Sequence, residues 1–138
     1  EGSITGIFSV LVDGDDHNDP VSDAIRGLLD GHIVLDRKTA EAGRYPPVEI
    51  LKSTSRLASR AWTEDQQELI HRIKGLISHY EDTKDLRMMG GFQITGDEHL
   101  EKACRLVPKI YEAMRQGAQQ PVPGDPFAEL AQALAADA

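Results

Sequence analysis

The residues from Ser3 to Val12, SITGIFSVLV, form an almost unbroken apolar run that is rich in β-branched side chains. Such a run is typical of a strand buried on both faces, because a half-exposed strand alternates apolar and polar residues. A strand of this kind requires neighbouring strands and helices that cover the sheet. We therefore predict an α/β fold, and we expect the chain to begin in the middle of a sheet.

Strand and helix signals alternate after this run. Asp19 is a good N-cap with Pro20 at the first helical position, so we expect a helix that stops near Gly31. Further expected elements are a buried strand at 32–35, a helix at 37–42 ended by Gly43, and a strand at 48–51. This alternation predicts right-handed crossovers and a mostly parallel sheet.

The second half of the chain is predicted to be helical. Thr63 and Gln66 have the spacing of a capping box, and an apolar face follows at helical spacing: Leu69, Ile70, Ile73, Leu76, Ile77 and Tyr80. More helices are expected at 84–89 and 97–115, and from Asp125 onward after a linker at 117–126. We assign residues 1–60 to a segment of a sheet domain and residues 61–138 to a helical domain.

The charge balance and the cysteine content limit the function classes. Lys and Arg number 15 against 23 Asp and Glu, for a net charge of -8, which argues against binding to nucleic-acid phosphates. The single cysteine, Cys104, excludes an intramolecular disulfide and favours a reducing compartment. The sequence contains no apolar run long enough for a bilayer and no leader pattern, so we expect a cytoplasmic protein.

An acidic stretch, DGDDHNDP, occupies residues 13–20. A calcium-binding EF-hand loop that starts at Asp13 would place Asn18 where glycine is required and Ala24 where glutamate is required, so that template fails. Transition-metal ligation is disfavoured because adjacent loop residues rarely converge on one ion, and we predict no metal site. A solvated loop that meets a partner protein is the favoured interpretation, and its candidate binding residues are Asp13, Asp15, Asp16 and Asp19.

No complete active site is apparent from spacing alone. The 5 histidines lack zinc spacing with Cys104, and the sequence contains neither a GxSxG motif nor a glycine-rich phosphate loop. Two residues of GRYPPVEILKSTSR, at 43–56, nevertheless draw interest. On the residues alone, Tyr45 between glycine and prolines is best explained as a hydrophobic plug at the sheet edge, and Arg56 as part of a surface ion pair.

A family resemblance changes the interpretation of these two residues. EGSITGIFSVLVDGDDHNDPVSDAIRGLLDGHIVLDR followed by GRYPPVEILKSTSR resembles the C-terminal part of the catalytic domain of the type III export ATPases, most closely the flagellar one. The chain is also similar, more distantly, to the α and β subunits of rotary ATP synthases. The helical half departs from the family pattern, since Gly90, Gly91 and Phe92 stand where the family has a Gly-Ala-Tyr segment.

The resemblance implies the C-terminal part of a RecA-like P-loop nucleoside triphosphatase sheet domain, followed by an α-helical C-terminal domain. It implies a ring of six subunits that hydrolyses MgATP between neighbours. Tyr45 matches an adenine-stacking tyrosine, and Arg56 matches a catalytic arginine that reaches the adjoining subunit's site. The family's phosphate-binding loop and catalytic Glu are expected upstream of Glu1. We therefore expect this chain by itself to be inactive and to bind neither ATP nor Mg²⁺.

The resemblance also implies partners. They are a coiled-coil stalk protein at the acidic stretch, export chaperones and the export gate, with peripheral membrane association through these proteins. The function implied is the export of flagellar proteins through a type III secretion apparatus. The alternative is a non-enzymatic interaction module that docks stalk, chaperone or cargo, in which residues 1–60 act only as a scaffold.

Overall fold

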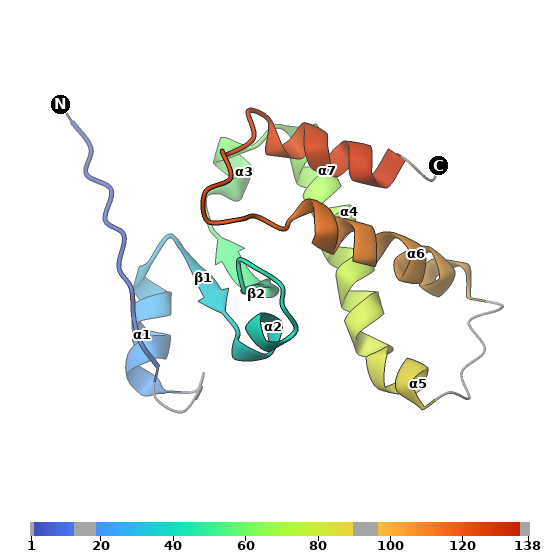
Figure 1. Cartoon of the computed structure of the whole chain (residues 1–138). Helices are drawn as coiled ribbons and strands as arrows, with labels where there is room; N and C mark the ends of the chain where they lie inside the picture. The colour runs from blue at the N-terminus through green and yellow to red at the C-terminus, as the bar shows by residue number, and fades with distance from the viewer. Residues whose placement is uncertain (1, 13–18, 90–96, 136–138) are drawn as a thin grey trace.

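The computed structural model describes residues 2–12, 19–89 and 97–135. In chain order the elements are α1 (Pro20–Leu28), β1 (Gly31–Leu35), α2 (Arg37–Glu41), β2 (Val48–Ser55), α3 (Ala58–Ala61), α4 (Glu64–Asp82), α5 (Lys84–Met88), α6 (Glu98–Ala113) and α7 (Pro126–Ala135). Figure 1 shows α1 and the extended N-terminal segment on one side of β1 and β2, with α4 and α6 on the other.

The N-terminal apolar run is not a buried strand in this chain. Residues 2–12 form no regular element, and the side chains of Ile4 and Leu11 are 100% and 95% exposed. The prediction for Ser3–Val12 is therefore wrong for the chain as it stands. The physical reason is that the described residues supply no neighbouring strand for its backbone groups and no layer against its side chains.

The predicted parallel sheet is also wrong. Among the described residues, β1 and β2 form a two-stranded antiparallel sheet in which Gly31 is opposite Ser55 and Leu35 is opposite Val48. The connection over 36–47 therefore starts and ends at the same end of the sheet. Its helix, α2, has only 5 residues and is too short to carry the chain across the sheet to a parallel position.

Local helix signals produce the predicted starts. The Asp19 carboxylate accepts a hydrogen bond from the Ser22 backbone N–H at 2.8 Å and caps α1. Asp36 caps α2 in the same way through the Thr39 N–H at 2.8 Å. The Thr63 hydroxyl accepts a hydrogen bond from the Gln66 backbone N–H, and the Gln66 side chain accepts one from the Thr63 backbone N–H. These two bonds confirm the capping box of α4.

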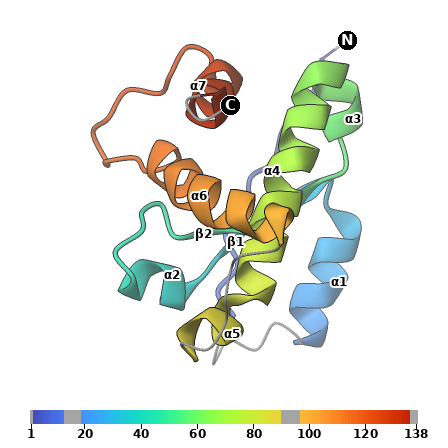
Figure 2. The same cartoon turned by 90° about the vertical axis from the view of Figure 1, so that its right-hand side faces the viewer.

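The core lies in the helical half of the chain. Figure 2 shows α6 crossing α4, and α7 packs against α6. The buried side chains that form the core come from these helices: Ile73, Ile77, Ala103, Leu106, Val107, Ile110 and Leu134. Ile50 of β2 packs against this cluster, and the Lys74 ammonium donates to the Ser53 carbonyl at 3.2 Å. The strands are thus attached to the helical core through β2.

Candidate functional site

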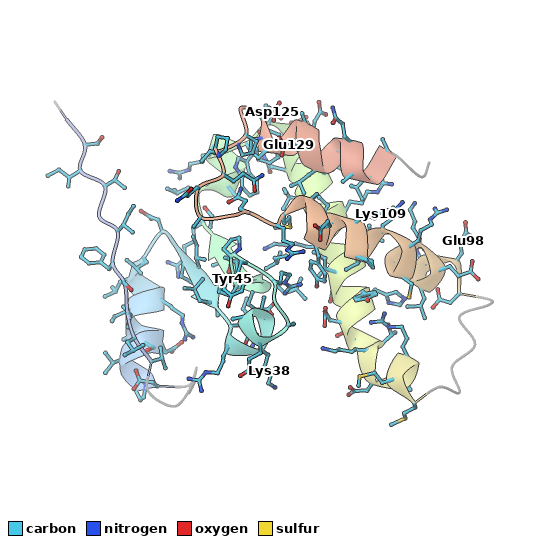
Figure 3. All side chains as sticks on the ribbon, viewed as in Figure 1. Lys38, Tyr45, Glu98, Lys109, Asp125 and Glu129 are labelled. Atoms are coloured by element: carbon cyan, nitrogen blue, oxygen red, sulfur yellow. The ribbon has the colours of Figure 1, made fainter. Side chains whose placement is uncertain are left out.

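Tyr45 lies in a loop whose backbone is held at several points. Gly43 has a φ of 74°, a conformation that glycine adopts without a side-chain penalty, and it turns the chain after α2. The Tyr45 carbonyl accepts a hydrogen bond from the Gln116 N–H at 3.0 Å, beyond the end of α6. The Tyr45 side chain itself is 54% exposed, so it is not the buried plug that the residues alone suggested (Figure 3). An aromatic face is available there for stacking.

Arg44, the residue before Tyr45, connects this loop to the helical core. Its guanidinium carbon lies 3.9 Å from the centroid of the Tyr111 ring on α6. One of its Nη groups also donates to the Thr39 hydroxyl at 3.2 Å. Arg44 was not identified from the sequence, because no local pattern connects it to an aromatic residue so far along the chain.

Tyr111 is fixed in turn by α4. Its hydroxyl donates to the Glu81 carboxylate at 2.8 Å. Burial, the largest effect, raises the pKa of Tyr111 to about 12. A tyrosine hydroxyl is protonated at neutral pH in any case, and this shift extends the pH range over which it donates to Glu81.

Arg56 follows β2 and contacts the C-terminal end of α1. Its Nη1 donates to the Gly27 carbonyl at 3.0 Å and its Nη2 lies 3.5 Å from the Arg26 carbonyl. These carbonyls belong to the last turn of the helix, where a positive charge is favourable. Among the described residues, the Arg56 guanidinium thus contacts backbone carbonyl oxygens of α1.

The structure does not bring Tyr45 and Arg56 together. Tyr45 precedes β2 and Arg56 follows it, and the two ends of β2 pair with Leu35 and Gly31 of β1. Those two β1 residues are about 13 Å apart at a rise of roughly 3.3 Å per residue. The two candidate site residues therefore occupy opposite ends of the sheet.

The acidic candidates are only partly described. Asp13, Asp15 and Asp16 lie outside the described residues. Asp19 is described, and one of its carboxylate oxygens is used to cap α1. Within the described ranges, no group of three or more His, Cys, Asp or Glu side chains is arranged to hold a metal ion.

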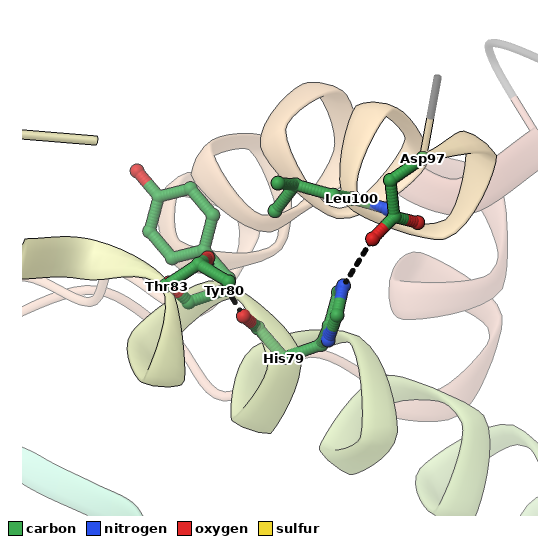
Figure 4. Close-up of polar contacts among 5 residues, drawn as sticks. All are labelled: His79, Tyr80, Thr83, Asp97 and Leu100. Atoms are coloured by element: carbon green, nitrogen blue, oxygen red, sulfur yellow. Dashed lines mark hydrogen bonds and ion pairs between the residues drawn. The ribbon is translucent and has the colours of Figure 1, made fainter. Parts of the chain in front are cut away.

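A second region with charged side chains lies between α4 and α6. A shallow cavity of about 560 Å³ is lined there by Arg72, Gly75, Leu76, His79, Asp97, His99 and Lys102. Within it, His79 Nε2 lies 3.6 Å from the Asp97 carboxylate (Figure 4). Asp97 also caps α6 through the Leu100 N–H at 3.1 Å, and this hydrogen bond is the main cause that lowers the pKa of Asp97. The pair joins α4 to the N-terminus of α6.

Comparison with known families assigns the chain. The T3SS EscN ATPase C-terminal domain matches residues 62–136, and the nucleotide-binding domain of the ATP synthase alpha/beta family matches residues 1–55. The chain belongs to the family of the T3SS EscN ATPase C-terminal domain. Both the predicted resemblance and the predicted fold class, the C-terminal part of an α/β ATPase followed by a helical domain, are confirmed.

Individual relatives extend this similarity. The flagellum-specific ATP synthase of Rhizobium meliloti is 55% identical over 99% of this chain and 29% of its own length. The assembled ATPase EscN of the enteropathogenic E. coli type III secretion system is 30% identical, with a TM-score of 0.90, over 97% of this chain and 33% of that chain. EscN in complex with its central stalk EscO matches with 27% identity and a TM-score of 0.76, over 83% of this chain and 29% of that one.

The chain therefore spans between 29% and 33% of the length of these three proteins. None of the described helices is both long enough and apolar enough to cross a membrane.

Proposed function

We propose that the chain is the C-terminal portion of a hexameric ATPase that energises the export of flagellar proteins through a type III secretion apparatus. The observation that carries this proposal is the similarity to a flagellum-specific ATP synthase over 99% of the chain. The ATP hydrolysis belongs to the longer protein. The similarity to a flagellum-specific ATP synthase and to the ATPase EscN favours an ATPase over the alternative, a module that only docks partners.

The proposed division is a sheet-domain segment over 1–60 and a helical domain over 61–138. It is supported by the position of the buried core, which lies in α4, α6 and α7. It is also supported by apolar side chains that stay exposed in the first segment: Ile4, Ile7, Phe8, Leu11, Val21, Leu28 and Ile33. In the longer protein we expect further strands and helices of the RecA-like domain to cover them, with Ser3–Val12 as one strand of that sheet.

Tyr45 is the proposed base-stacking residue. A half-exposed ring on a loop with a fixed backbone offers adenine a stacking face at little ordering cost. Among the described residues, no three His, Cys, Asp or Glu side chains are grouped to hold a metal ion. For this reason we assign to this chain's own residues only the stacking face and the arginine, and no step through the metal.

Arg56 is the proposed catalytic arginine, and it acts in the adjoining subunit. Its guanidinium has more N–H groups than the Gly27 and Arg26 carbonyls use, and its side chain is exposed. It can therefore rest against α1 and still donate to the phosphate oxygens of ATP bound by a neighbour. Arg56 and Tyr45 lie at opposite ends of β2. This separation is consistent with Tyr45 contributing to one nucleotide site and Arg56 to another.

The proposed partners follow from charge and from the relatives. EscN has been solved in complex with its central stalk, and we propose that the acidic residues Asp13, Asp15, Asp16 and Asp19 contact a corresponding coiled-coil stalk. Export chaperones and the export gate are further proposed partners. We place the protein in the cytoplasm, at the membrane only through these partners.

The test uses the longer protein that contains this chain. Purified to homogeneity, it should assemble into hexamers and release phosphate from ATP in a Mg²⁺-dependent way, whereas residues 1–138 alone should release none. The control is the longer protein with its upstream catalytic Glu replaced by Gln. If the longer protein assembles and binds the stalk but hydrolyses no ATP, the interaction-module alternative replaces this proposal.

A further inference from the structure

The loop that carries Tyr45 is attached to the helical domain at two points, the Arg44 side chain and the Tyr45 backbone carbonyl. The Tyr45 carbonyl accepts from the Gln116 N–H at 3.0 Å. The preceding side chain, Arg44, stacks on Tyr111 with 3.9 Å between the guanidinium carbon and the ring centroid. A cation over an aromatic face contributes about 0.5–1 kcal/mol when exposed and more when desolvated. Both attachments come from α6 or from the residues that follow it.

Arg44 is also held from the strand side. Its Nη2 donates to the Thr39 hydroxyl at 3.2 Å, and this hydroxyl donates to the Asp36 carboxylate at 3.0 Å. Thr39 is buried, with 7% of its surface exposed, so its hydroxyl has little freedom to find another partner. The guanidinium is therefore fixed between α2 on one side and α6 on the other.

The helical end of this chain of contacts is anchored at α4. Tyr111 donates to Glu81 at 2.8 Å, and burial raises the pKa of Tyr111 further above neutral pH, to about 12. Contacts thus continue from α2 through Arg44 and Tyr111 to Glu81. Arg44 is joined to Tyr45 by a peptide bond, so the contacts that hold its side chain also restrain the loop backbone next to Tyr45.

We propose that the Arg44–Tyr111–Glu81 contact positions the Tyr45 ring for the nucleotide base, so that the placement of the helical domain sets nucleotide affinity. This inference rests on the proposed stacking role of Tyr45. Arg44, Tyr111 and Glu81 are positioning residues here, because they act through Tyr45 and are not assigned any contact with the nucleotide. A change in the angle at which α4 and α6 cross would move Tyr111, and through Arg44 it would shift the Tyr45 ring relative to the nucleotide base.

The experiment measures steady-state ATP hydrolysis by the longer protein in four backgrounds: unchanged, Arg44→Ala, Tyr45→Ala, and both substitutions together. Arg115→Ala is the matched control, because Arg115 is an exposed arginine just after α6 that pairs with Glu112 at 3.4 Å. Two milder variants accompany them. Tyr111→Phe keeps the ring under Arg44 but removes the hydroxyl, and Glu81→Gln keeps an oxygen that can accept from it.

We expect Arg44→Ala to raise the KM for ATP roughly three- to tenfold with kcat nearly unchanged, as for the loss of one contact of this size. Tyr111→Phe should raise KM by a smaller factor. Glu81→Gln, which leaves a weaker neutral acceptor for the Tyr111 hydroxyl, should raise KM no more than Tyr111→Phe does, and Arg115→Ala should leave KM unchanged. In the Tyr45→Ala background, Arg44→Ala should add nothing, because the ring through which it acts is gone.

The measured KM values distinguish failure of the stacking role of Tyr45 from failure of the positioning role of Arg44. If Tyr45→Ala leaves KM unchanged, the stacking role of Tyr45 is wrong, and this inference fails with it. If Tyr45→Ala raises KM but Arg44→Ala does not, or if the two effects multiply in the double variant, the positioning role alone is overturned. Should Arg44→Ala prevent folding, Arg44→Lys and Tyr111→Phe decide: unchanged KM in both, with a normal melting temperature, overturns the proposal.

Discussion

Arg56 Nη1 donates to the Gly27 carbonyl at 3.0 Å and so contacts the end of a helix that begins nearly forty residues earlier in the chain. The Arg56 N–H adds a second contact to the same region, at 2.7 Å from the Asp30 carbonyl. A residue proposed for catalysis in a neighbouring subunit therefore also donates hydrogen bonds to the C-terminus of α1 in its own subunit. Substitutions at Arg56 should have two separable effects.

The first prediction concerns the structural effect. Replacing Arg56 by Ala removes the positive charge and the donors at the C-terminus of α1, and should cost about 0.5–1 kcal/mol of local stability. Amide hydrogen exchange measured on the longer protein should become faster in the last turn of α1 and stay unchanged in α4. Unchanged exchange in α1 would show that the Gly27 contact contributes nothing.

The second prediction concerns pH. The Thr39 backbone N–H is the largest cause that holds the pKa of Asp36 below its ordinary value of 3.8. A carboxylate whose pKa is lowered on folding stabilises the fold above its unfolded pKa, and this contribution is lost as the pH falls through the folded pKa. Asp36→Ala should therefore cost about 1 kcal/mol at pH 7 and little near pH 2, as expected for a lost N-cap.

Urea unfolding of the two proteins at both pH values measures this difference. Asp36→Asn is the matched variant, because it can still cap α2 but cannot titrate in this range. A cost for Asp36→Ala that is equal at pH 7 and pH 2 would contradict the assignment of this carboxylate as the group that titrates.

The third prediction concerns the acidic stretch. Replacing Asp15 and Asp16 by Asn in the longer protein should reduce stimulation of hydrolysis by the stalk protein and leave basal hydrolysis nearly intact, because the loss of charge weakens attraction to a basic helix. Glu68→Gln, at an exposed position on α4, is the control and should change neither rate. Full stalk stimulation in the Asp15→Asn, Asp16→Asn protein would argue against this contact.

Local signals in the sequence predicted much of the fold. Asp19 and Thr63 begin helices where their capping patterns place them, because an N-cap depends only on neighbours within one turn. The pattern of Ser3–Val12 differs from a capping pattern because it depends on distant parts of the fold. Its pattern records burial against other strands, and the described residues contain none of them. For the same reason, alternation of strands and helices did not predict the antiparallel pairing of β1 with β2.

The site shows the same limit. Tyr45 and Arg56 were identified through the motif that contains both, but the motif does not reveal that they lie at opposite ends of β2. No pattern in the sequence identified Arg44 or Tyr111 as site residues. Their contact joins two residues that are far apart in sequence, and it depends on how β2 packs against α4 and α6. Local patterns hold no information about that packing.

The central claim is that Arg56 completes the catalytic site of an adjoining subunit. The most direct measurement mixes two inactive forms of the longer protein, one with Arg56→Ala and one with the upstream catalytic Glu replaced by Gln, after subunit exchange has been verified. We expect each form alone to lose roughly a thousandfold or more in kcat, and mixing to restore part of the activity at interfaces that pair an intact Arg56 with an intact Glu. No recovery on mixing, or near-normal kcat for Arg56→Ala alone, would contradict it.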